Sequence, residues 1–475
     1  MKKATDRLAL DSSLILVCAT FVWVLAALTP RLIGADGWLA LVGGRSIVEH
    51  GLPAHDTLAV LTRGRTWIDQ QWLGQLGLYG LVRLGGTTLV LVANMFLVVT
   101  AFVAAAAYGR RRSGAPTTAA VCALLAALPF LITAADVRTQ SWTYLPFVVL
   151  LAVLNRPTIT VRQTAAVLAL LVVWANVHGS VLLAASAVAV RGGVELTRAR
   201  RERASRRVGW IMLLAPWACV VASPYHVHLI SYYRGTAFNA TFGKYLAQWG
   251  PTVLSVRSLP LFVLVFASIW SLGRAGGVYS GYERILLWGC AFLALLAFRD
   301  WPFAILPVLM FGPVGLDRAL RRTRPQRRPR FGAVIAVGAV AVAVVTVTVA
   351  LADAGQQLGR YYPEAAAASA ARAASGAGAT VYAGERFGDW LLWTHPGLSR
   401  HLAFDVRYEL LRPSELRRLA LFDVGSEVGR ALGGPSVYVL DPQNEDQAIA
   451  ALRADVRIVY DTREAVVAVA RNRST

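Results

Sequence analysis

The sequence contains few charged residues for its length and almost no lysine. Only 16% of its 475 residues are charged, 56% are apolar, and the mean hydropathy is +0.51. Lysine occurs only at Lys2, Lys3 and Lys244. This composition excludes a soluble globular protein and predicts a multi-pass membrane protein.

Cysteines and mid-membrane charges are scarce as well. The cysteines lie inside apolar runs and give no support to a disulfide framework or a zinc knuckle; they are Cys18, Cys122, Cys219 and Cys290. The apolar runs hold almost no ionisable residues, which proton- or ion-coupled transporters generally need at mid-depth. Chemistry is therefore expected outside the apolar runs.

The formal charge of +21 indicates which loops lie in the cytoplasm and does not indicate a nucleic-acid partner. The arginines gather in short clusters between apolar runs, at residues 110–112, 156–162, 197–207 and 318–330. Such clusters are typical of cytoplasmic loops. We expect a bacterial plasma-membrane protein with a cytoplasmic N-terminus.

The apolar runs predict an all-α membrane domain of about 11 spans over residues 1–352. The expected spans are residues 14–33, 88–108, 116–133, 141–154, two short helices within 164–190 that break at 176–180, then 208–223, 259–272, 285–298, 301–315 and 331–351. The segment 72–86 is too short to span and contains Arg83, so it is predicted as an interfacial or re-entrant helix.

The long apolar runs end near residue 352. Residues 353–475 alternate between short strand-like and helical patterns, which predicts a small extracytoplasmic α/β domain. Strands are expected at 379–382, 401–406, 436–440 and 456–460, and helices at 363–374, 413–422 and 444–454.

Polar residues that could carry chemistry lie in the predicted external segments, above all in the first external loop, residues 35–86. Carboxylates, histidines and arginines at one interface suit a reaction on a lipid-borne phosphate, with a carboxylate as base and cations on the leaving phosphate. The carboxylate candidates are Asp36 and Asp56. The phosphate-binding candidates are Arg63, Arg65, Arg138, Arg234, Lys244 and Arg299, with His178, His226 and His228 as secondary candidates.

The first external loop resembles that of polytopic bacterial membrane proteins with the GT-C glycosyltransferase architecture, a group that includes protein mannosyltransferases and aminoarabinose transferases. The matching positions are Asp36, Trp38, Gly44, Ile47, Gly51, Pro53, Asp56, Gly64, Trp67, Trp72 and Leu73. Further matches are WANVHG at 174–179, SPYHVHLI at 223–230, FGDWLLWTHPG at 387–397 and FDVRYEL at 404–410.

The resemblance implies transfer of a sugar from a polyprenyl-phosphate donor to an envelope glycan, lipid or protein acceptor on the extracytoplasmic side. It also implies that Asp36, in the usual position of the base or metal-site residue, takes the acceptor proton. The paired acidic motif of the family is missing, because Ala35 and Gly37 flank Asp36. This absence argues against a metal-dependent mechanism, and a divalent metal is left as a possible cofactor.

Several simpler roles compete with these assignments. Asp36 may equally cap a helix that starts at Gly37, and Asp56 before Thr57 suits a turn. His178 is expected to bond a backbone carbonyl freed by the helix break, and the pair His226 and His228 faces one way only on a strand. A non-catalytic envelope scaffold and a lipid or polysaccharide transporter are the rival functions.

Overall fold

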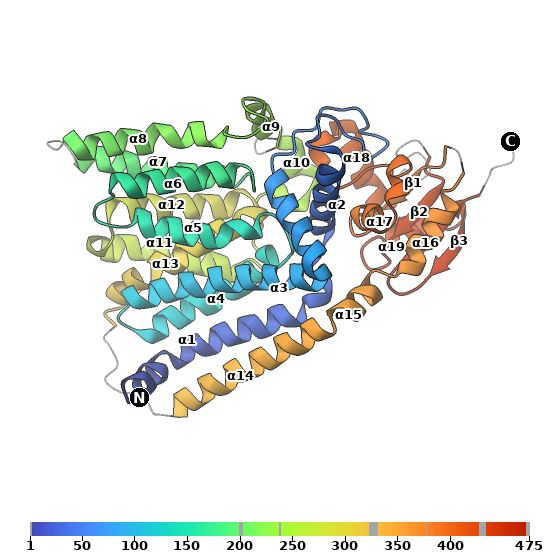
Figure 1. Cartoon of the computed structure of the whole chain (residues 1–475). Coiled ribbons are helices and arrows are strands. Elements are labelled where there is room, and N and C mark those ends of the chain that lie inside the picture. The colour runs from blue at the N-terminus through green and yellow to red at the C-terminus, as the bar shows by residue number, and fades with distance from the viewer. Residues whose placement is uncertain are drawn as a thin grey trace.

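The computed structural model describes residues 2–198, 203–236, 239–322, 331–376, 378–426 and 434–471. Helices packed side by side form a bundle, and a small domain with a sheet lies at one end of it (Figure 1). The bundle helices are α1 (Lys2–Ala27), the second part of α3 (Trp72–Arg112), α4 (Pro116–Ala134), α5 (Ser141–Leu154), α6 (Val161–Ala175), α7 (Val181–Arg198), α8 (Arg203–Val220), α11 (Leu259–Ala275), α12 (Gly281–Leu296), α13 (Trp301–Ala319) and α14 (Phe331–Ala352).

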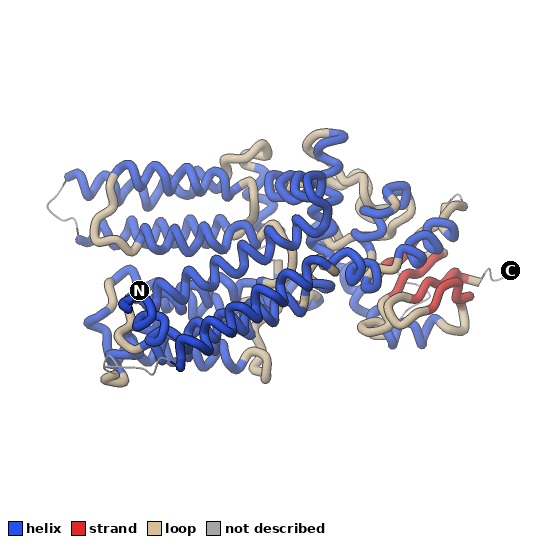
Figure 2. Tube along the Cα trace, turned by 60° about the horizontal axis from the view of Figure 1, so that its bottom comes forward, coloured by secondary structure: helices blue, strands red, loops and turns tan. Residues whose placement is uncertain are grey.

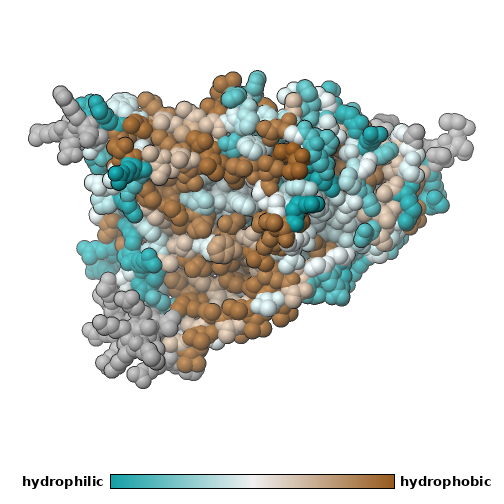
Figure 3. Space-filling view, viewed as in Figure 1, coloured by the Kyte–Doolittle hydropathy of each residue, from teal (hydrophilic) through white to brown (hydrophobic). Residues whose placement is uncertain are grey.

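The bundle has the surface of a membrane protein. Figure 3 shows apolar residues covering the middle of the bundle and hydrophilic residues at its ends. Within the described residues five helical segments are long and apolar enough to cross a membrane: Trp72–Arg112, Pro116–Ala134, Leu259–Val278, Phe298–Ala319 and Gly332–Ala352. Every predicted span overlaps a helix over most of its length, although 14–33, 208–223 and 285–298 extend beyond the ends of α1, α8 and α12. The number of eleven crossings stays a prediction, because several of these helices are shorter.

Helix α13 forms the centre of the bundle. It packs against α3, α4, α11 and α12, and its residues 301–313 are buried. The sequence of residues 301–316 contains no charged side chain. A helix that is buried on all sides needs apolar side chains on all of its faces, as α13 has. By contrast, α14 packs mainly on α1 and exposes a row of valines, which suits a helix at the lipid-facing edge.

The first external loop forms a crosspiece between the bundle and the small domain. Helix α2 (Ala35–His50) runs across the direction of the bundle helices (Figure 1) and packs on the start of α3. A Cβ atom on Gly44 would lie 2.4 Å from the carbonyl oxygen of Gln75, so only glycine permits this approach. Helix α3 breaks at Gly85 and Gly86, where Gly86 has a φ of 66°. The predicted short helix over residues 72–86 is therefore the first part of α3.

Short elements connect the bundle helices at the end where the small domain lies. They are η1 (Thr29–Arg31), α9 (His228–Thr236), α10 (Ala240–Tyr245), η2 (Ala247–Trp249) and η4 (Phe298–Asp300). The turn η3 (Gly276–Val278) follows α11. The N-terminal helix starts at the opposite end of the bundle from the small domain (Figure 1). This arrangement agrees with the predicted opposite placement of the two ends, although the side of the membrane stays a prediction.

The small domain holds all the strands found in the described residues (Figure 2). Its sheet has the order β1-β2-β4-β3, formed by Val381–Ala383, Val437–Leu440, Val466–Ala470 and Val456–Asp461. Strands β1 and β2 are parallel, whereas β4 is antiparallel to both of its neighbours. The surrounding helices are α15 (Ala354–Tyr361), α16 (Glu364–Ala373), α17 (Gly388–Thr394), η5 (Pro396–Arg400), η6 (Tyr408–Leu410), α18 (Pro413–Asp423) and α19 (Asp446–Leu452).

One predicted strand of this domain is wrong, and one strand was missed. Residues 401–406 make only an isolated bridge between Leu402 and Val381, and Leu402 and Ala403 also bond to the first external loop. The backbone N–H of Val60 donates to Leu402 and that of Leu61 donates to Ala403. Strand β4, a continuous apolar run, was not predicted; it lies between the buried strand β2 and the largely exposed edge strand β3.

Candidate active site

Asp36 lies where the first external loop, the bundle and the small domain meet. It is in the first turn of α2, whose N-cap is Gly34, so the predicted capping role at a helix starting with Gly37 is wrong. A carboxylate in the first turn is still favourable beside the free N–H groups of the helix. The side chain of Asp36 remains 49% exposed, which leaves it open to a ligand.

Asp36 forms an ion pair with Arg138 from the loop between α4 and α5. The Nε atom of Arg138 lies 3.1 Å from an Asp36 oxygen, and its Nη2 atom donates to Asp136 at 3.0 Å. The loop approaches α2 closely, because a Cβ on Gly37 would lie 2.9 Å from the Val137 carbonyl oxygen. The three charged groups form a cluster that we call the Asp36 cluster: Asp36, Asp136 and Arg138.

His178 and Arg299 are linked by hydrogen bonds to residues just after Arg138. The Ser180 hydroxyl, which bonds to His178 at 2.9 Å, lies 3.3 Å from that of Thr143. The carbonyl oxygen of Arg299 accepts from Gln140. Burial lowers the pKa of His178 to about 3, and the positive charges of Arg299 and Arg138 lower it further. The backbone N–H of Ser180 donates to Nδ1 of His178 at 3.1 Å, so the neutral ring carries its proton on Nε2. His178 can therefore donate a hydrogen bond, but it is not a cation that binds phosphate at neutral pH.

Arg299 lies in η4, at the start of α13. Its guanidinium stacks 3.7 Å from the centre of the Trp249 ring in η2, and its backbone carbonyl accepts a hydrogen bond from Gln140 at 3.5 Å. Stacking on an aromatic face holds the guanidinium in place while its edge stays free for an anion. This is the arrangement expected of a positioned phosphate-binding arginine.

Glu409 in η6 is a member of this neighbourhood that the sequence did not single out as a candidate. Burial raises the pKa of Glu409 to about 7, with opposition from Arg407 and a further increase from the charges of Asp405 and Asp36. The small domain thus contributes a buried carboxyl group whose pKa responds to the charge of Asp36. The FDVRYEL motif contained this residue, but its spacing gave no sign that it approaches the first loop.

Asp56, the second predicted carboxylate, is fully buried and holds the small domain to the first loop. One oxygen accepts from the Leu58 N–H at 2.9 Å and from Arg407 at 2.5 Å, and the other accepts from Thr62 at 2.5 Å. Arg407 also pairs with Asp405 at 2.5 Å and lies over the Trp67 ring at 4.2 Å. We call these groups the Arg407 clamp: Asp56, Trp67, Asp405 and Arg407. With both oxygens occupied, Asp56 suits a structural role.

Arg63 and Arg65 also contact the small domain rather than the Asp36 cluster. Arg65 makes a two-point ion pair with Glu415, at 2.8 Å and 2.7 Å, and donates to the Leu410 carbonyl at 2.6 Å. The exposed Arg63 donates to the Ser399 carbonyl at 2.9 Å. These hydrogen bonds indicate that both residues attach the first external loop to the small domain.

The remaining candidates are spread over the surface. Arg234, Lys244, His226 and His228 are exposed on or beside α9 and α10. His228 is the first residue of α9, and His226 precedes it with a φ of 46°, so the two do not form the strand pair that a metal would use. In the part of the chain that the structure describes, no group of three His, Cys, Asp or Glu side chains is arranged to hold a metal ion.

A buried carboxyl group in the first loop predicts a pH dependence of stability. Asp69 is 2% exposed, accepts from Gln75 at 2.8 Å through one oxygen, and has no partner on the other oxygen. Burial raises its pKa from 3.8 to about 7, the charge of Arg407 opposes this shift, and Glu409 adds to it. The folded state therefore holds a proton that the unfolded state has lost, so the free energy of unfolding falls as the pH rises across this range.

Replacement of Asp69 by asparagine mimics the protonated form. We expect Asp69→Asn to melt at a higher temperature than the wild type at about pH 8 and to show little difference at about pH 4. Thermal unfolding of the detergent-solubilised protein, followed by tryptophan fluorescence, measures this. The exposed Asp446→Asn is the matched control. Parallel melting curves for Asp69→Asn and wild type at every pH would contradict the assignment.

The sequence matches no protein-family model and no curated protein. Three crystal structures align with nearly the whole chain. The Archaeoglobus fulgidus oligosaccharyltransferase in the apo form is 12% identical with a TM-score of 0.49, over 98% of this chain and 75% of its own. ArnT from Cupriavidus metallidurans bound to undecaprenyl phosphate is 15% identical with a TM-score of 0.46, over 97% of this chain and 98% of its own. The apo state of ArnT is 15% identical with a TM-score of 0.50, over 96% of this chain and 97% of its own.

The likeness to apo ArnT extends over the bundle and the small domain together. The chain has the GT-C fold. At this identity the likeness concerns the arrangement of the helices and not the activity. The Asp36 cluster of this GT-C chain therefore has to be judged on its own geometry, which joins three separate parts of the fold around an accessible carboxylate.

Proposed function

We propose that the protein is an integral membrane glycosyltransferase that moves a sugar from a polyprenyl-phosphate donor to a cell-envelope acceptor at the extracytoplasmic face. The observation that carries this proposal is the Asp36 cluster, with Arg299, His178 and Glu409 nearby. Helix α2, which carries Asp36, lies at the end of the bundle away from the N-terminus (Figure 1). ArnT, whose apo state has the same fold, has also been crystallised bound to undecaprenyl phosphate.

The proposed reaction needs one base and one anion-stabilising group. The acceptor hydroxyl oxygen attacks the anomeric carbon of the sugar, the bond from that carbon to the phosphate oxygen breaks, and polyprenyl phosphate leaves with the bonding electrons. Asp36 takes the hydroxyl proton, because it is an exposed carboxylate with a free oxygen. Arg138 and Arg299 stabilise the negative charge that develops on the phosphate.

Asp136 and His178 support this proposed site. Asp136 shares Arg138 with Asp36, so the guanidinium is held between two carboxylates and fixes the orientation of Asp36. His178 supplies a neutral N–H donor for a sugar hydroxyl or phosphate oxygen.

The structure gives less support to a transporter. Transport of a polar lipid or polysaccharide requires a polar path through the spans. The centre of the bundle is filled by α13, whose buried residues 301–313 have no charged side chain. A non-catalytic scaffold with the same fold is distinguished only by an activity measurement.

The test is a transfer assay with the purified protein in lipid nanodiscs. The donor is a polyprenyl phosphate that carries a radiolabelled sugar, and the acceptor is a cell-envelope extract. We expect label to move from the lipid fraction to the envelope fraction while free polyprenyl phosphate accumulates in equal amount. A well-folded protein that leaves a panel of polyprenyl-phosphate sugars unchanged would favour the scaffold function instead.

A further inference from the structure

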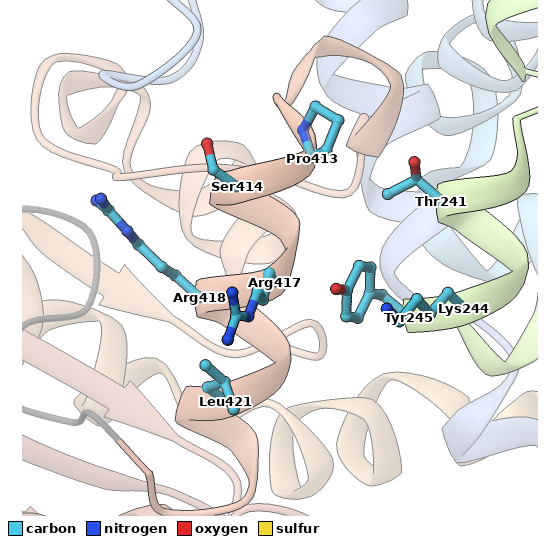
Figure 4. A pocket seen from close by; sticks show the side chains of 8 residues that line it. All are labelled: Thr241, Lys244, Tyr245, Pro413, Ser414, Arg417, Arg418 and Leu421. Atoms are coloured by element: carbon cyan, nitrogen blue, oxygen red, sulfur yellow. The ribbon is translucent and has the colours of Figure 1, made fainter.

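A basic groove lies between α10 and the helix α18 of the small domain, apart from the Asp36 cluster. Its volume is about 610 Å³. The residues that line it are Thr241, Lys244, Tyr245, Pro413, Ser414, Arg417, Arg418 and Leu421. Figure 4 shows Lys244 and Tyr245 on one wall and Arg417 on the other, while Arg418 leaves α18 on the side turned away from Lys244. Of its eight lining residues, three are cations and none is acidic.

The cations of this groove are not neutralised by neighbouring acids. Neither Lys244 nor Arg417 forms an ion pair with any described residue. Glu415 is on the same helix, but its carboxylate is occupied by Arg65 in a two-point pair. The Lys244 ammonium lies 5.3 Å from the centre of the Tyr245 ring. Cations without a carboxylate partner that line one hollow attract an anion.

The walls of the groove are rigid. Phe242 of α10 is 2% exposed and packs in one apolar cluster with Leu416, Leu419 and Phe422 of α18. This packing fixes the spacing between the walls, and so the spacing between Lys244 and Arg417. A fixed spacing favours an extended ligand with regularly placed charges over a single mobile ion.

Both walls are joined to the candidate active site. Helix α18 follows η6, which contains Glu409, and α10 leads into η2, whose Trp249 stacks on Arg299. A ligand that occupies the groove is therefore held beside elements that position charged groups near Asp36. This continuity distinguishes the groove from a scattered basic surface.

We propose that the groove binds an anionic stretch of the acceptor glycan, with carboxylate or phosphate groups on Lys244 and Arg417 and a sugar ring against Tyr245. This inference rests on the proposed glycosyltransferase function and specifies that the acceptor is negatively charged. An anionic lipid headgroup is less well suited to the groove. A lipid site needs exposed apolar side chains for the acyl chains, and the described residues 239–250 and 411–421 expose no large apolar side chain.

The test measures binding by the full-length protein in nanodiscs of uncharged lipid. The probes are oligogalacturonate, which has a carboxylate on each sugar, and a neutral malto-oligosaccharide of the same length. We expect the wild type to bind oligogalacturonate, more weakly as salt is raised, and to bind the neutral oligosaccharide much less. The double variant Lys244→Gln/Arg417→Gln, with one change on each wall, should bind oligogalacturonate about tenfold more weakly.

The matched control removes two positive charges elsewhere on the small domain. Arg457→Gln/Arg463→Gln changes the exposed strand β3 and the turn after it, at the sheet edge. Equal loss of binding in both double variants would overturn the proposal, because it would show attraction to net charge alone. Equal binding of the neutral oligosaccharide would overturn it too.

Two further probes separate the other anionic ligands. Inorganic phosphate and vesicles that contain phosphatidylglycerol are tested with the same variants. If the groove variant loses vesicle binding but the wild type does not bind oligogalacturonate, the groove is a headgroup site and the glycan proposal fails. Because every readout is binding, a failure of the transfer assay leaves this test intact, and a failure here leaves the transfer assay intact.

Discussion

Replacement of Asp36 by asparagine is expected to lower the rate of sugar transfer by about 10²–10⁴-fold, the usual contribution of a general base. Asparagine has nearly the same shape, but it cannot take a proton from the acceptor hydroxyl. Arg138 keeps its ion pair with Asp136 when Asp36 is replaced, so the substitution leaves no unpaired charge behind and the protein should fold normally. Transfer of labelled sugar in nanodiscs measures the rate, and thermal unfolding checks the fold.

Asp136 provides the matched control for this experiment. It pairs with the same Arg138, at 3.0 Å, and its side chain is 42% exposed. Asp136→Asn therefore removes a comparable ion pair without removing the proposed base. We expect Asp136→Asn to lose much less activity than Asp36→Asn. Equal losses in the two variants would assign Asp36 to the positioning of Arg138, and full activity of Asp36→Asn would remove it from the mechanism.

The second large effect concerns the attachment of the small domain. Arg407→Gln is expected to destabilise the protein by about 3–5 kcal/mol, the usual result of removing one partner from a buried ion pair. Asp56, Asp405 and Arg407 are at most 5% exposed, and the variant leaves two buried carboxylates without their cation. The stacking contact with Trp67 is lost as well. Thermal unfolding and limited proteolysis between the bundle and the small domain measure the effect.

The exposed Arg400→Gln changes the same charge on the same domain and should leave stability nearly unchanged. The double variant Asp56→Asn/Arg407→Gln tests the ion pair itself. Arg407→Gln leaves the Asp56 carboxylate without its cation, and Asp56→Asn removes that carboxylate. The loss of stability in the double variant should therefore be smaller than the sum of the losses in the two single variants. Additive losses would show that Asp56 and Arg407 stabilise the protein independently.

The clamp and the candidate site differ in how far they could be predicted. Asp36 follows the first apolar run, and Arg138 lies between two spans, so their common end of the bundle could be inferred from the alternation of spans. Their ion pair could not, because it depends on the approach of the 135–140 loop to Gly37. Asp56, Arg63 and Arg65 are polar loop residues like Asp36, and nothing in their spacing shows that their partners are 336–351 positions away.

The small domain shows the same difference at the level of secondary structure. Residues 437–440 and 456–461 form strands where strand-like runs were predicted at 436–440 and 456–460. Residues 401–406 have a strand-like composition, yet they pair with Val60 and Leu61 of the first loop outside the sheet. Strand formation depends on which partner edge is available, and the partner here is supplied by a distant part of the chain.

The sequence by itself determined the membrane-embedded helices, because burial in lipid requires long runs of apolar residues that can be recognised without any partner. It also determined that the polar candidates lie outside these runs. Only the tertiary structure decided which of those candidates meet. Ion pairs act over a few ångströms, and the distances that separate Asp36 from Arg138, or Asp56 from Arg407, are set by how α2, the 135–140 loop and the small domain pack together.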